Sequence, residues 1–467
     1  MDIYLQNTLT REKERFVPLR CGQVGIYSCG PTVYQAASIG NLRAYIFADA
    51  LRRMLEYNGL KVKHVMNITD VGHLVSDEDE GEDKMLVGAQ REKKTPWEIA
   101  AHYSDLFVQD IGRLNILRPT LLVKATLHIS EMIAMVEELL ERGYAYETSD
   151  GIYYDISKYP EYGLLSGIKL DEQRAGARVD VNLEKRHPAD FALWKKAPPE
   201  HIMQWESPWG MGYPGWHIEC SAMSRKYLGD LFDIHTGGVD HIPIHHENEI
   251  AQTAACTGQP GARYWMHNEF LLVDGGKMSK SLGNTYTITD LVERGFEPLA
   301  YRYFNLNAHY RRQLNFTWSA LEAAQKGLRG LRKQVQQSAR QPQSERGRQR
   351  AAEYRQQFLA AINDDLNLPR AMALLWEAVH EDLGSDLFTL ARDFDRVLAL
   401  DLCSGPAETE ERLMLEQLPA AVQMLLQERQ AARQRKDWGE ADRIRDQLKE
   451  LGYAVKDTPQ GIEITRV

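Results

Sequence analysis

Four side chains in separate segments carry donor atoms that could bind a transition metal. If the segment 243–249 is helical, His245 and Glu249 lie four residues apart and project from one face. Cys29 ends the first predicted strand, and Cys220 could supply a second thiolate. Two thiolates, one imidazole and one carboxylate suit zinc better than magnesium or calcium. Because cysteine is among the most buried residue types, a core position is the alternative for each thiol unless all four groups converge.

The loop 277–281 presents two cations on a glycine-led turn. Lys277 and Lys280 flank small hydroxyl residues, and two glycines precede them. A cationic clamp of this kind suits the polyphosphate charge of a transition state. When this loop is considered alone, an exposed lysine–serine loop without such a role is the alternative.

The segment 30–41 leaves the first predicted strand and opens the first predicted helix. Free backbone N–H groups and the helix dipole at such a junction point toward whatever binds there. Gly40 would let a ligand approach the backbone closely. Taken by itself, this strand–turn–helix pattern occurs in many doubly wound proteins and assigns no activity.

The elements that must position these groups begin with a β-α-β unit. Residues 24–29 form a β-branched and aromatic run that a Gly-Pro pair stops, and residues 62–68 form a second apolar run. Between them, apolar residues recur at helical spacing over 41–57. A parallel strand pair with a crossover helix predicts a doubly wound sheet, whose ligands bind at the carboxyl ends of the strands. The acidic run 77–83 is expected to be a solvated loop.

The rest of the chain predicts an insertion followed by helices. An apolar helix over 129–140 and a strand over 151–154 precede renewed sheet patterning at 231–235 and 270–273. After Trp318 the pattern is helical until a strand signal near the C-terminus. We therefore expect an α/β fold, in which a doubly wound parallel-sheet (Rossmann-like) catalytic domain with an insertion is followed by a mainly helical C-terminal region.

Charge is distributed unevenly along the chain. The net charge of −10 argues weakly against a nucleic-acid partner. Residues 311–355, however, hold eleven Lys or Arg against three Asp or Glu, which is the electrostatic footprint of a phosphate-backbone partner. A solvated basic helix is the alternative. Within this stretch, residues 336–349 are rich in Gln, Ser and Arg and are expected to form a mobile linker.

Length and composition limit the remaining classes of protein. At ~150 residues per domain, 467 residues suggest about three domains. With 43% hydrophobic and 26% charged residues, the composition excludes a disordered chain, a collagen and a disulfide scaffold. No run approaches the ~18 apolar residues of a membrane span, and the N-terminus lacks a signal-peptide pattern. Five scattered cysteines suit a reducing compartment, so we expect a cytoplasmic protein with no membrane partner.

Together these segments resemble the class I aminoacyl-tRNA synthetases, and among them the cysteinyl-tRNA synthetase family. The four residues 38–41 stand where that family has His-Ile-Gly-His or His-Ile-Gly-Asn, and residues 277–281 match its Lys-Met-Ser-Lys-Ser signature in full. Residues 29–34, 215–223 and 245–249 resemble the segments that bind zinc in this family. Further matches run from Tyr-Leu-Gln-Asn-Thr-Leu-Thr near the N-terminus to Asp-Thr-Pro-Gln-Gly near the C-terminus, so the resemblance covers nearly the whole chain.

The resemblance implies a reaction, its partners and a set of residues. The enzyme would activate L-cysteine with ATP and Mg²⁺, release pyrophosphate, and transfer the cysteinyl group to the 3′ end of cysteine tRNA. It would hold one Zn²⁺ per chain, act in the cytoplasm and be a monomer. The implied residues are catalytic Ser38, Gly40, Asn41, Lys277, Lys280 and Ser281; ATP-binding Gly40, Asn41, Gly238, Asp240 and Lys280; substrate-binding Cys29, Thr69 and Trp216; and zinc-binding Cys29, Cys220, His245 and Glu249.

The resemblance also assigns roles to the predicted domains. These are a Rossmann-like catalytic domain over 1–115 and 206–265, a connective insertion over 116–205, a lysine-loop and stem-contact region over 266–317, a helical tRNA-binding bundle over 318–403, and a small anticodon-binding domain over 404–467.

The zinc ligands would explain selection of cysteine. A substrate thiol on zinc loses its proton and gains a metal–sulfur bond, whereas serine offers a far less acidic hydroxyl and alanine offers no ligand. A site built around one specific polar bond rejects analogues that lack it by ~10⁴ or more, so no separate editing domain is expected.

Two alternative functions remain open at this stage. The first is a ligase that passes the cysteinyl adenylate to a small-molecule amine, but the residues after Trp318 would then have no purpose. The second is a non-catalytic paralogue that binds zinc and nucleic acid, and its only support is Ser38, where the family has histidine. Serine can cap the helix but lacks the reach and charge of imidazole, so we expect adenylation that is slower by on the order of 10²–10³.

Overall fold

The structure of the protein is a computed structural model. It describes residues 2–72, 84–168, 184–199, 201–279, 283–404, 418–435, 437–458 and 461–466. The predicted acidic loop 77–83 lies outside the described residues, as do Lys280 and Ser281 of the lysine loop. The remaining predicted site residues are described.

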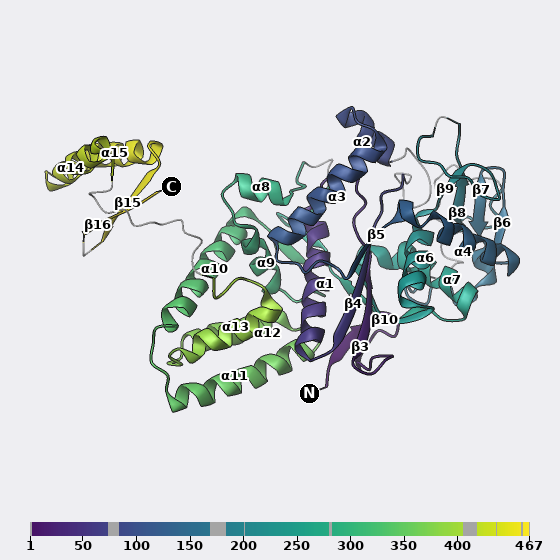
Figure 1. The fold of residues 1–467 in the computed structure, drawn as a ribbon, viewed down its shortest axis with the longest axis horizontal. Coiled ribbons are helices and arrows are strands. Elements are labelled where there is room, and N and C mark those ends of the chain that lie inside the picture. Colours follow the sequence, from purple (N-terminus) through teal and green to yellow (C-terminus); the bar gives the residue numbers. More distant parts are fainter. Residues whose placement is uncertain are drawn as a thin grey trace.

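A five-stranded parallel sheet forms the centre of the catalytic body (Figure 1). Its strand order is β11-β10-β3-β4-β5, and every neighbouring pair runs parallel. The chain moves outward from β3 in one direction and later returns to fill the other side, which is the topology of a doubly wound sheet. The predicted fold class is confirmed. The strands are β3 (Gln23–Ser28), β4 (Lys61–Ile68), β5 (Leu121–Lys124), β10 (Leu231–Gly238) and β11 (Gly261–Asn268).

Helices cover both faces of this sheet (Figure 1). Val24 and Ile26 of β3 belong to the core shared with α1 and α3, whereas Tyr27 belongs to the core shared with α4, α6 and α7. The division follows from the alternation of side chains along a strand. The helices are α1 (Ile39–Tyr57), α2 (Lys84–Glu92), α3 (Pro96–Arg113), α4 (Ile129–Glu141), α6 (Trp216–Leu228) and α7 (Glu247–Thr257).

The turn between β3 and α1 requires a glycine. The N–H of Gly30 donates to Oδ1 of Asn67 at 2.8 Å, and a Cβ at Gly30 would lie 1.6 Å from the carbonyl oxygen of Asn67. Any side chain larger than hydrogen would therefore force β3 and β4 apart at the edge where the strands end. The expected helix over 41–57 begins two residues earlier, at Ile39, and ends at Tyr57 as predicted.

The insertion contains a four-stranded antiparallel sheet of order β6-β7-β8-β9. It lies on the opposite side of the catalytic sheet from the later helices (Figure 1). The predicted insertion 116–205 also includes β5, which pairs with β4 in the main sheet. The insertion strands are β6 (Ala145–Glu147), β7 (Gly151–Tyr154), β8 (Phe191–Lys196) and β9 (Gly212–Pro214).

A three-stranded sheet follows the catalytic domain and carries the start of the lysine loop. Its order is β13-β12-β14, with β13 (Gly276–Lys277) antiparallel to β12 (Leu271–Val273) and β14 (Leu314–Phe316) parallel to it. The short helices α8 (Ile288–Glu293) and α9 (Pro298–Leu306) lie between β13 and β14 in the chain. At the N-terminus, β1 (Tyr4–Asn7) and β2 (Glu12–Arg15) form a separate hairpin.

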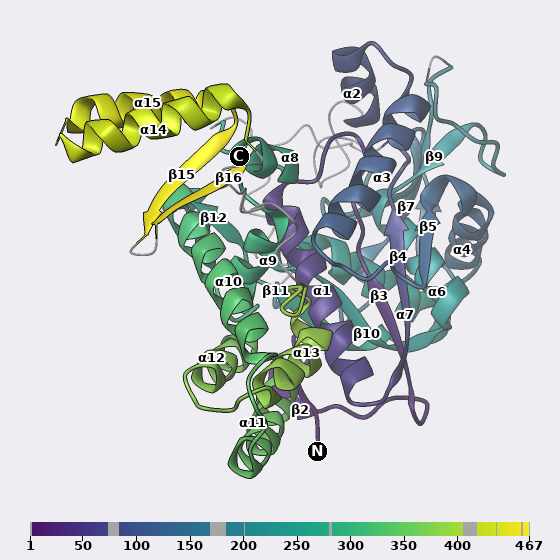
Figure 2. The same cartoon turned by 60° about the vertical axis from the view of Figure 1, so that its left-hand side comes forward.

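Four helices pack into a bundle beside α1 and α9 (Figure 2). Helices occupy both ends of the predicted linker 336–349, because α10 continues to Ser338 and α11 begins at Glu345, so the connecting segment is only 339–344. Gln, Arg and Glu have good helix propensity, so a composition that is common in linkers also extends helices. The bundle helices are α10 (Trp318–Ser338), α11 (Glu345–Asn363), α12 (Leu368–Val379) and α13 (Asp386–Leu398).

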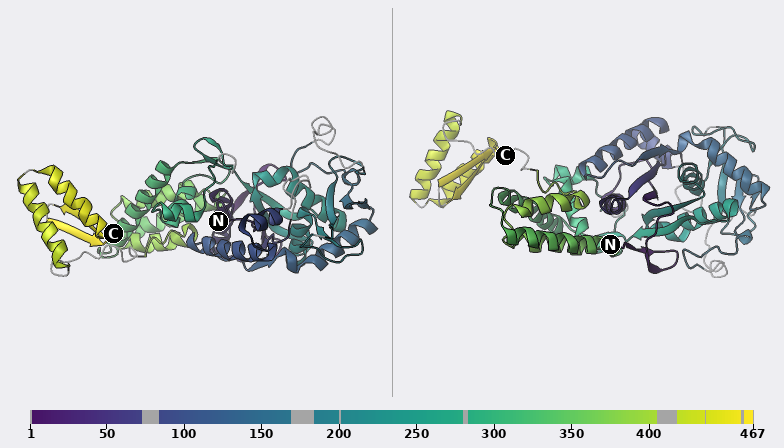
Figure 3. Two further views of the ribbon diagram at one scale, coloured as in Figure 1. Left: turned by 90° about the horizontal axis from the view of Figure 1, so that it is seen from above. Right: turned by 60° about the horizontal axis from the view of Figure 1, so that its bottom comes forward.

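The C-terminal residues form a small unit with its own core. It lies beyond the bundle, away from the catalytic sheet (Figure 3). Helices α14 (Ala420–Gln434) and α15 (Trp438–Glu450) pack on the hairpin of β15 (Tyr453–Thr458) and β16 (Gly461–Arg466). Among the described residues, no helix has the length and apolar character of a membrane span. The core of the unit comprises Leu418, Val422, Leu426, Ile444, Leu448, Tyr453 and Ile464.

Candidate active site

A cavity of about 620 Å³ opens at the carboxyl edge of the main sheet. Segments from the ends of β3, β4, β10 and β11 line it, together with the start of α1 and the strand pair β12–β13. This is the position at which doubly wound sheets bind ligands. The three segments that carried chemistry in the sequence therefore meet in one place.

The four predicted metal ligands converge at one side of this cavity. Cys29, Cys220, His245 and Glu249 are all buried, and their ligand atoms lie within 4.8 Å of one another. Nε2 of His245 is 3.1 Å from Oε1 of Glu249, and Sγ of Cys29 is 3.8 Å from the same oxygen. This is the convergence that distinguishes a metal site from separate core positions.

Three elements bring these ligands together. Cys29 directly follows β3, Cys220 lies one turn inside α6, and Glu249 lies in the first turn of α7. His245 belongs to a π-helical turn, Ile242–His246, that leads into α7. The side chains of His245 and Glu249 meet, so the same-face expectation is correct although the turn is wider than an α-helix.

The electrostatics favour the charged forms of Glu249, His245 and Cys220 despite their burial, whereas burial raises the pKa of the Cys29 thiol and favours its neutral form. Burial would raise the pKa of Glu249, but His235 and His245 lower it to about 2. Burial would lower the pKa of His245, but Glu249 and Cys220 raise it to about 10. A hydrogen bond from Cys29 lowers the pKa of the Cys220 thiol, with a further contribution from His245. A cation that binds to His245 would therefore displace the proton that this histidine holds.

Sequence reasoning missed a set of buried histidines behind the ligands. Nε2 of His235 is 2.9 Å from Oε2 of Glu249, and Nδ1 of His217 is 2.9 Å from Nδ1 of His245. Nε2 of His246 is 3.2 Å from Sγ of Cys29. The signal in the sequence was the presence of His235 and His267 near the carboxyl ends of β10 and β11, where ligands bind. The rings that contact the ligand group or one another are His217, His235, His241, His246 and His267.

Two of the predicted substrate-binding residues line the same cavity as Cys29. Thr69 and Trp216 are both lining residues, and Oγ1 of Thr69 donates to Oε2 of Glu219 at 2.8 Å. Glu219 is fully buried beside Cys220 on α6, so it fixes the orientation of the threonine hydroxyl. The ring of Trp216 lies 4.4 Å from that of His245 and forms the wall next to the ligand group.

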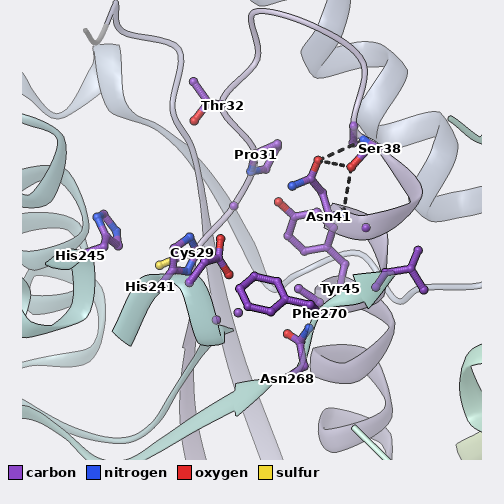
Figure 4. A pocket seen from close by; sticks show the side chains of 18 of the residues that line it. Cys29, Pro31, Thr32, Ser38, Asn41, Tyr45, His241, His245, Asn268 and Phe270 are labelled. Atoms are coloured by element: carbon purple, nitrogen blue, oxygen red, sulfur yellow. Dashed lines mark hydrogen bonds between the residues drawn. The ribbon is translucent and has the colours of Figure 1, made fainter. Parts of the chain in front are cut away.

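Ser38 caps α1, and its side chain is bonded to Asn41 (Figure 4). The Ser38 hydroxyl donates to Oδ1 of Asn41 at 2.7 Å, and the backbone N–H of Asn41 donates to Oγ of Ser38 at 3.2 Å. The expectation that serine caps this helix is correct. Both side chains line the cavity, as do Gly40, Gly238 and Asp240.

The first signature segment is bonded to residues that follow the lysine loop, and Met278 of that loop lies beside Gly40. The backbone N–H of Ile39 donates to the carbonyl oxygen of Tyr286 at 2.8 Å, and the hydroxyl of Tyr301 donates to the carbonyl oxygen of Ile39 at 2.6 Å. The sulfur of Met278 would lie 3.5 Å from a Cβ at Gly40. Lys277 lines the cavity. The N-terminus of α1 and the start of the lysine loop therefore form one wall.

The fold is shared with solved aminoacyl-tRNA synthetases. The methionyl-tRNA synthetase of Mycobacterium tuberculosis, solved with methionyl-adenylate, is 15% identical and aligns with a TM-score of 0.56 over 81% of this chain and 90% of that chain. The ternary LeuRS–tRNA–LeuAMS complex from Agrobacterium radiobacter K84 is 11% identical, with a TM-score of 0.60 over 82% of this chain and 85% of that chain. At these levels of identity, the likeness establishes the class of fold alone.

Comparison of the sequence gives the family within this class. The family described as "tRNA synthetases class I (C) catalytic domain" matches residues 15–326, and "Cysteinyl-tRNA ligase anticodon binding domain" matches residues 415–464. Cysteine–tRNA ligase 1 of Burkholderia lata is 50% identical over 99% of this chain and 96% of its own. The enzyme of Treponema denticola, named cysteine–tRNA ligase, is 42% identical over 98% of both chains. The chain belongs to the cysteinyl-tRNA ligase family, so the resemblance is confirmed.

Proposed function

We propose that this protein attaches L-cysteine to the 3′ end of cysteine tRNA in two ATP-dependent steps. The observation that carries the proposal is that Cys29, Cys220 and His245 line one cavity with both signature segments, and that Glu249 joins these three side chains in one four-ligand group. In the first step the substrate carboxylate attacks the α-phosphorus of ATP, and pyrophosphate leaves. In the second step a terminal ribose hydroxyl of the tRNA attacks the activated carbonyl, and AMP leaves.

The four-ligand group fits one Zn²⁺ ion better than an alkaline-earth ion. Its donors are two sulfurs, one nitrogen and one carboxylate oxygen, and soft thiolates select zinc over magnesium or calcium. A zinc ion held there would favour the thiolate form of the substrate sulfur and bind it. Two other residues position the ligands. His235 is hydrogen-bonded to the second carboxylate oxygen of Glu249, and the ring of Trp216 packs beside that of His245. Serine and alanine would lack the sulfur for which this wall is built.

The other side of the cavity suits ATP and its Mg²⁺. Because Oδ1 of Asn41 is bonded to Ser38, its carboxamide is held in one orientation, in which Nδ2 can donate to a phosphate. The dipole of α1, whose positive end lies at this N-terminus, favours negative charge near Gly40. Lys277 supplies a cation from the same wall of the cavity. Gly238 and Asp240 complete the lining on the β10 side, and Lys280 and Ser281 belong to the same proposal from sequence alone.

Transfer RNA is the partner that gives the C-terminal unit a purpose. Trp438 is 57% exposed, and the guanidinium of Arg433 lies 5.7 Å from its ring centroid. An exposed aromatic ring beside a cation is a platform on which an unpaired base can stack. The family model of an anticodon-binding domain matches residues 415–464, which supports a role in tRNA binding for the small domain that we propose over 404–467. A small-amine acceptor is therefore not favoured.

The basic stretch 311–355 contributes less free charge than the sequence suggested. Several of its arginines are paired with acidic residues from elsewhere in the chain, such as Glu297 and Glu381. Lys333 and Arg340, in contrast, are exposed and make no ion pair within the described part of the protein. We propose that these two cations face tRNA phosphates. The pairs are Arg311–Asp365, Arg329–Glu297, Arg332–Glu297, Arg350–Glu381 and Arg355–Asp393.

Cysteine-dependent exchange of pyrophosphate into ATP, followed by charging of a cysteine tRNA, tests the proposal. Exchange with serine or alanine in place of cysteine should be lower by ~10⁴ or more. A chain truncated after Ser404 should keep exchange and lose most charging. The cut lies beyond Leu400 and Leu402, which are fully buried against the bundle, and it spares that core. Absence of exchange would favour the non-catalytic alternative, and undiminished charging after truncation would remove the tRNA role of the C-terminal unit.

We also propose a monomer that acts in the cytoplasm. The support for a reducing compartment is that none of the five cysteines is in a disulfide.

A further inference from the structure

The side-chain amide of Asn284 bonds to the backbone on the other side of the lysine loop. Its Oδ1 accepts from the N–H of Ser279 at 2.8 Å, and its Nδ2 donates to the carbonyl oxygen of Lys277 at 3.1 Å. We propose that Asn284 is a positioning residue for adenylation, which fixes the backbone from which Lys277 faces the cavity. This inference rests on the proposed function and adds a residue to it.

The chemistry of the amide explains why asparagine serves here. A carboxamide offers an acceptor and donors on one planar group, so it can satisfy an N–H and a C=O two residues apart. An aspartate could accept from Ser279 but could not donate to the carbonyl of Lys277. A hydrophobic residue would leave both backbone groups without this partner.

The backbone at Lys277 otherwise has little support. Strand β13 has two residues, and its ladder with β12 consists of Leu272 opposite Lys277 and Val273 opposite Gly276. Beyond Lys277 this ladder ends, at the point where the chain turns toward the cavity. The bonds to Asn284 begin there, and they hold Lys277 and Ser279 on either side of Met278, which also lines the cavity.

The segment that carries Asn284 is anchored to the first signature. Two residues later, the carbonyl oxygen of Tyr286 accepts from the N–H of Ile39 at 2.8 Å. The amide of Asn284 thus connects the Lys277 backbone, through a short stretch of chain, to the N-terminus of α1. This connection links the position of the Lys277 backbone to the start of α1 near Gly40.

The variant Asn284→Ala tests the inference in the full-length enzyme. We expect kcat of cysteine-dependent pyrophosphate exchange to fall by about 10- to 100-fold, the cost of a small misplacement of a reacting group. The KM for ATP should rise, because Lys277 faces the phosphates, while the KM for cysteine stays within about twofold, because the ligand group lies across the cavity. Circular dichroism and thermal unfolding, compared with the wild type, show whether the variant is folded.

Asn315→Ala is the matched control. Oδ1 of Asn315 accepts from the N–H of Gly275 at 2.7 Å, so it supports the hairpin turn before Lys277 in the same way. Asn315 is exposed and does not line the cavity. We expect its removal to change exchange by less than about threefold, as for an ordinary surface hydrogen bond of ~1 kcal/mol or less. An equal loss in Asn284→Ala and Asn315→Ala would overturn the inference.

A double-variant cycle with Lys277→Ala separates positioning from general damage. If Asn284 acts through Lys277, then Asn284→Ala should cost less than about threefold in the Lys277→Ala background, because residues that act as a unit are not additive. A multiplicative loss would overturn the inference, as would wild-type exchange rates in Asn284→Ala. If the wild type shows no exchange, the proposed function and this inference fall together. Exchange in the wild type with an additive cycle removes only the role of Asn284.

Discussion

Ser38 and Asn41 satisfy each other through a reciprocal pair of hydrogen bonds at the start of α1. The backbone N–H of Asn41 donates to Oγ of Ser38 at 3.2 Å, and the backbone N–H of Ser38 donates to Oδ1 of Asn41 at 3.1 Å. The serine in place of the family histidine is thus part of a capping box. The N-terminus of α1 is therefore capped by the side chain of Ser38.

The variant Ser38→His should therefore be less stable than the wild type but faster in pyrophosphate exchange. Loss of the cap should lower the free energy of unfolding by ~1 kcal/mol, and an imidazole near the phosphates should raise kcat of pyrophosphate exchange at saturating cysteine. Urea unfolding and exchange kinetics measure the two effects. Ser344→His, which removes the cap of α11 far from the cavity, controls for the loss of stability alone. An unchanged or lower rate in Ser38→His would mean that the site is built around serine.

Zinc content should depend on Cys220 and not on Cys256. Purified wild-type protein should hold about one zinc per chain, since one four-ligand group is proposed. Cys220→Ser should lose most of this zinc and weaken discrimination against serine. Cys256 is a buried cysteine on α7 outside the ligand group, so Cys256→Ser should keep the metal. Elemental analysis decides, and full zinc with unchanged selectivity in Cys220→Ser would refute the assignment.

His64 should make the protein less stable in mild acid. Its ring is buried with Nε2 2.9 Å from Oγ of Ser28, and burial, with a smaller effect of Arg52, lowers the pKa of His64 from 6.5 to about 3. The folded protein holds the neutral form, so this stability is complete above pH 6.5 and is lost as the pH falls toward 3. Each pH unit below 6.5 costs about 1.4 kcal/mol in the free energy of unfolding.

The variant His64→Gln isolates this effect, because glutamine does not titrate. Urea unfolding at neutral pH and near pH 5 should show the wild type losing ~2 kcal/mol relative to the variant, on top of changes common to both proteins. A constant difference between the two proteins across this range would contradict the buried neutral state of His64.

Lys333 and Arg340 should contribute to tRNA affinity through phosphate charge alone. Replacing both by glutamine should weaken binding of all tRNAs to a similar degree and lower the slope of log affinity against log salt by about 1 to 2. Lys61→Gln is the control, because Lys61 is exposed at the amino end of β4, on the opposite edge of the sheet from the cavity. Filter binding over a range of salt concentrations measures the slope. An unchanged slope would place the tRNA elsewhere.

The parts of this protein that the sequence predicted are those specified by local pattern. The β-α-β unit follows from breakers around residues 24–29 and from periodicity up to Tyr57. The His245–Glu249 pair follows from helical spacing. The sequence did not predict side chains that come together only in the folded protein. His235 and His267 lie on two strands, and they are brought near each other because β10 and β11 are neighbours in the sheet.

Charge was misjudged for the same reason. The excess of cations over 311–355 is real in the sequence, but the acidic partners of several arginines come from other segments, as Glu297 does for Arg332. A count of charged residues within one segment of the sequence omits the acidic residues of other segments that pair with its arginines in the folded protein. Free cations such as Lys333 are recognised only when the folded neighbours are known.

The separate core of the C-terminal unit has a consequence for affinity. A tRNA that touches both this unit and the catalytic body makes its second contact within one complex, so that contact forms at an effective concentration rather than at the concentration of free tRNA. Two modest sites would then hold the tRNA much more tightly than either alone. Removal of the C-terminal unit should therefore weaken tRNA binding by more than the affinity of the isolated unit for tRNA would suggest. The anticodon would be one of two contacts through which the tRNA binds.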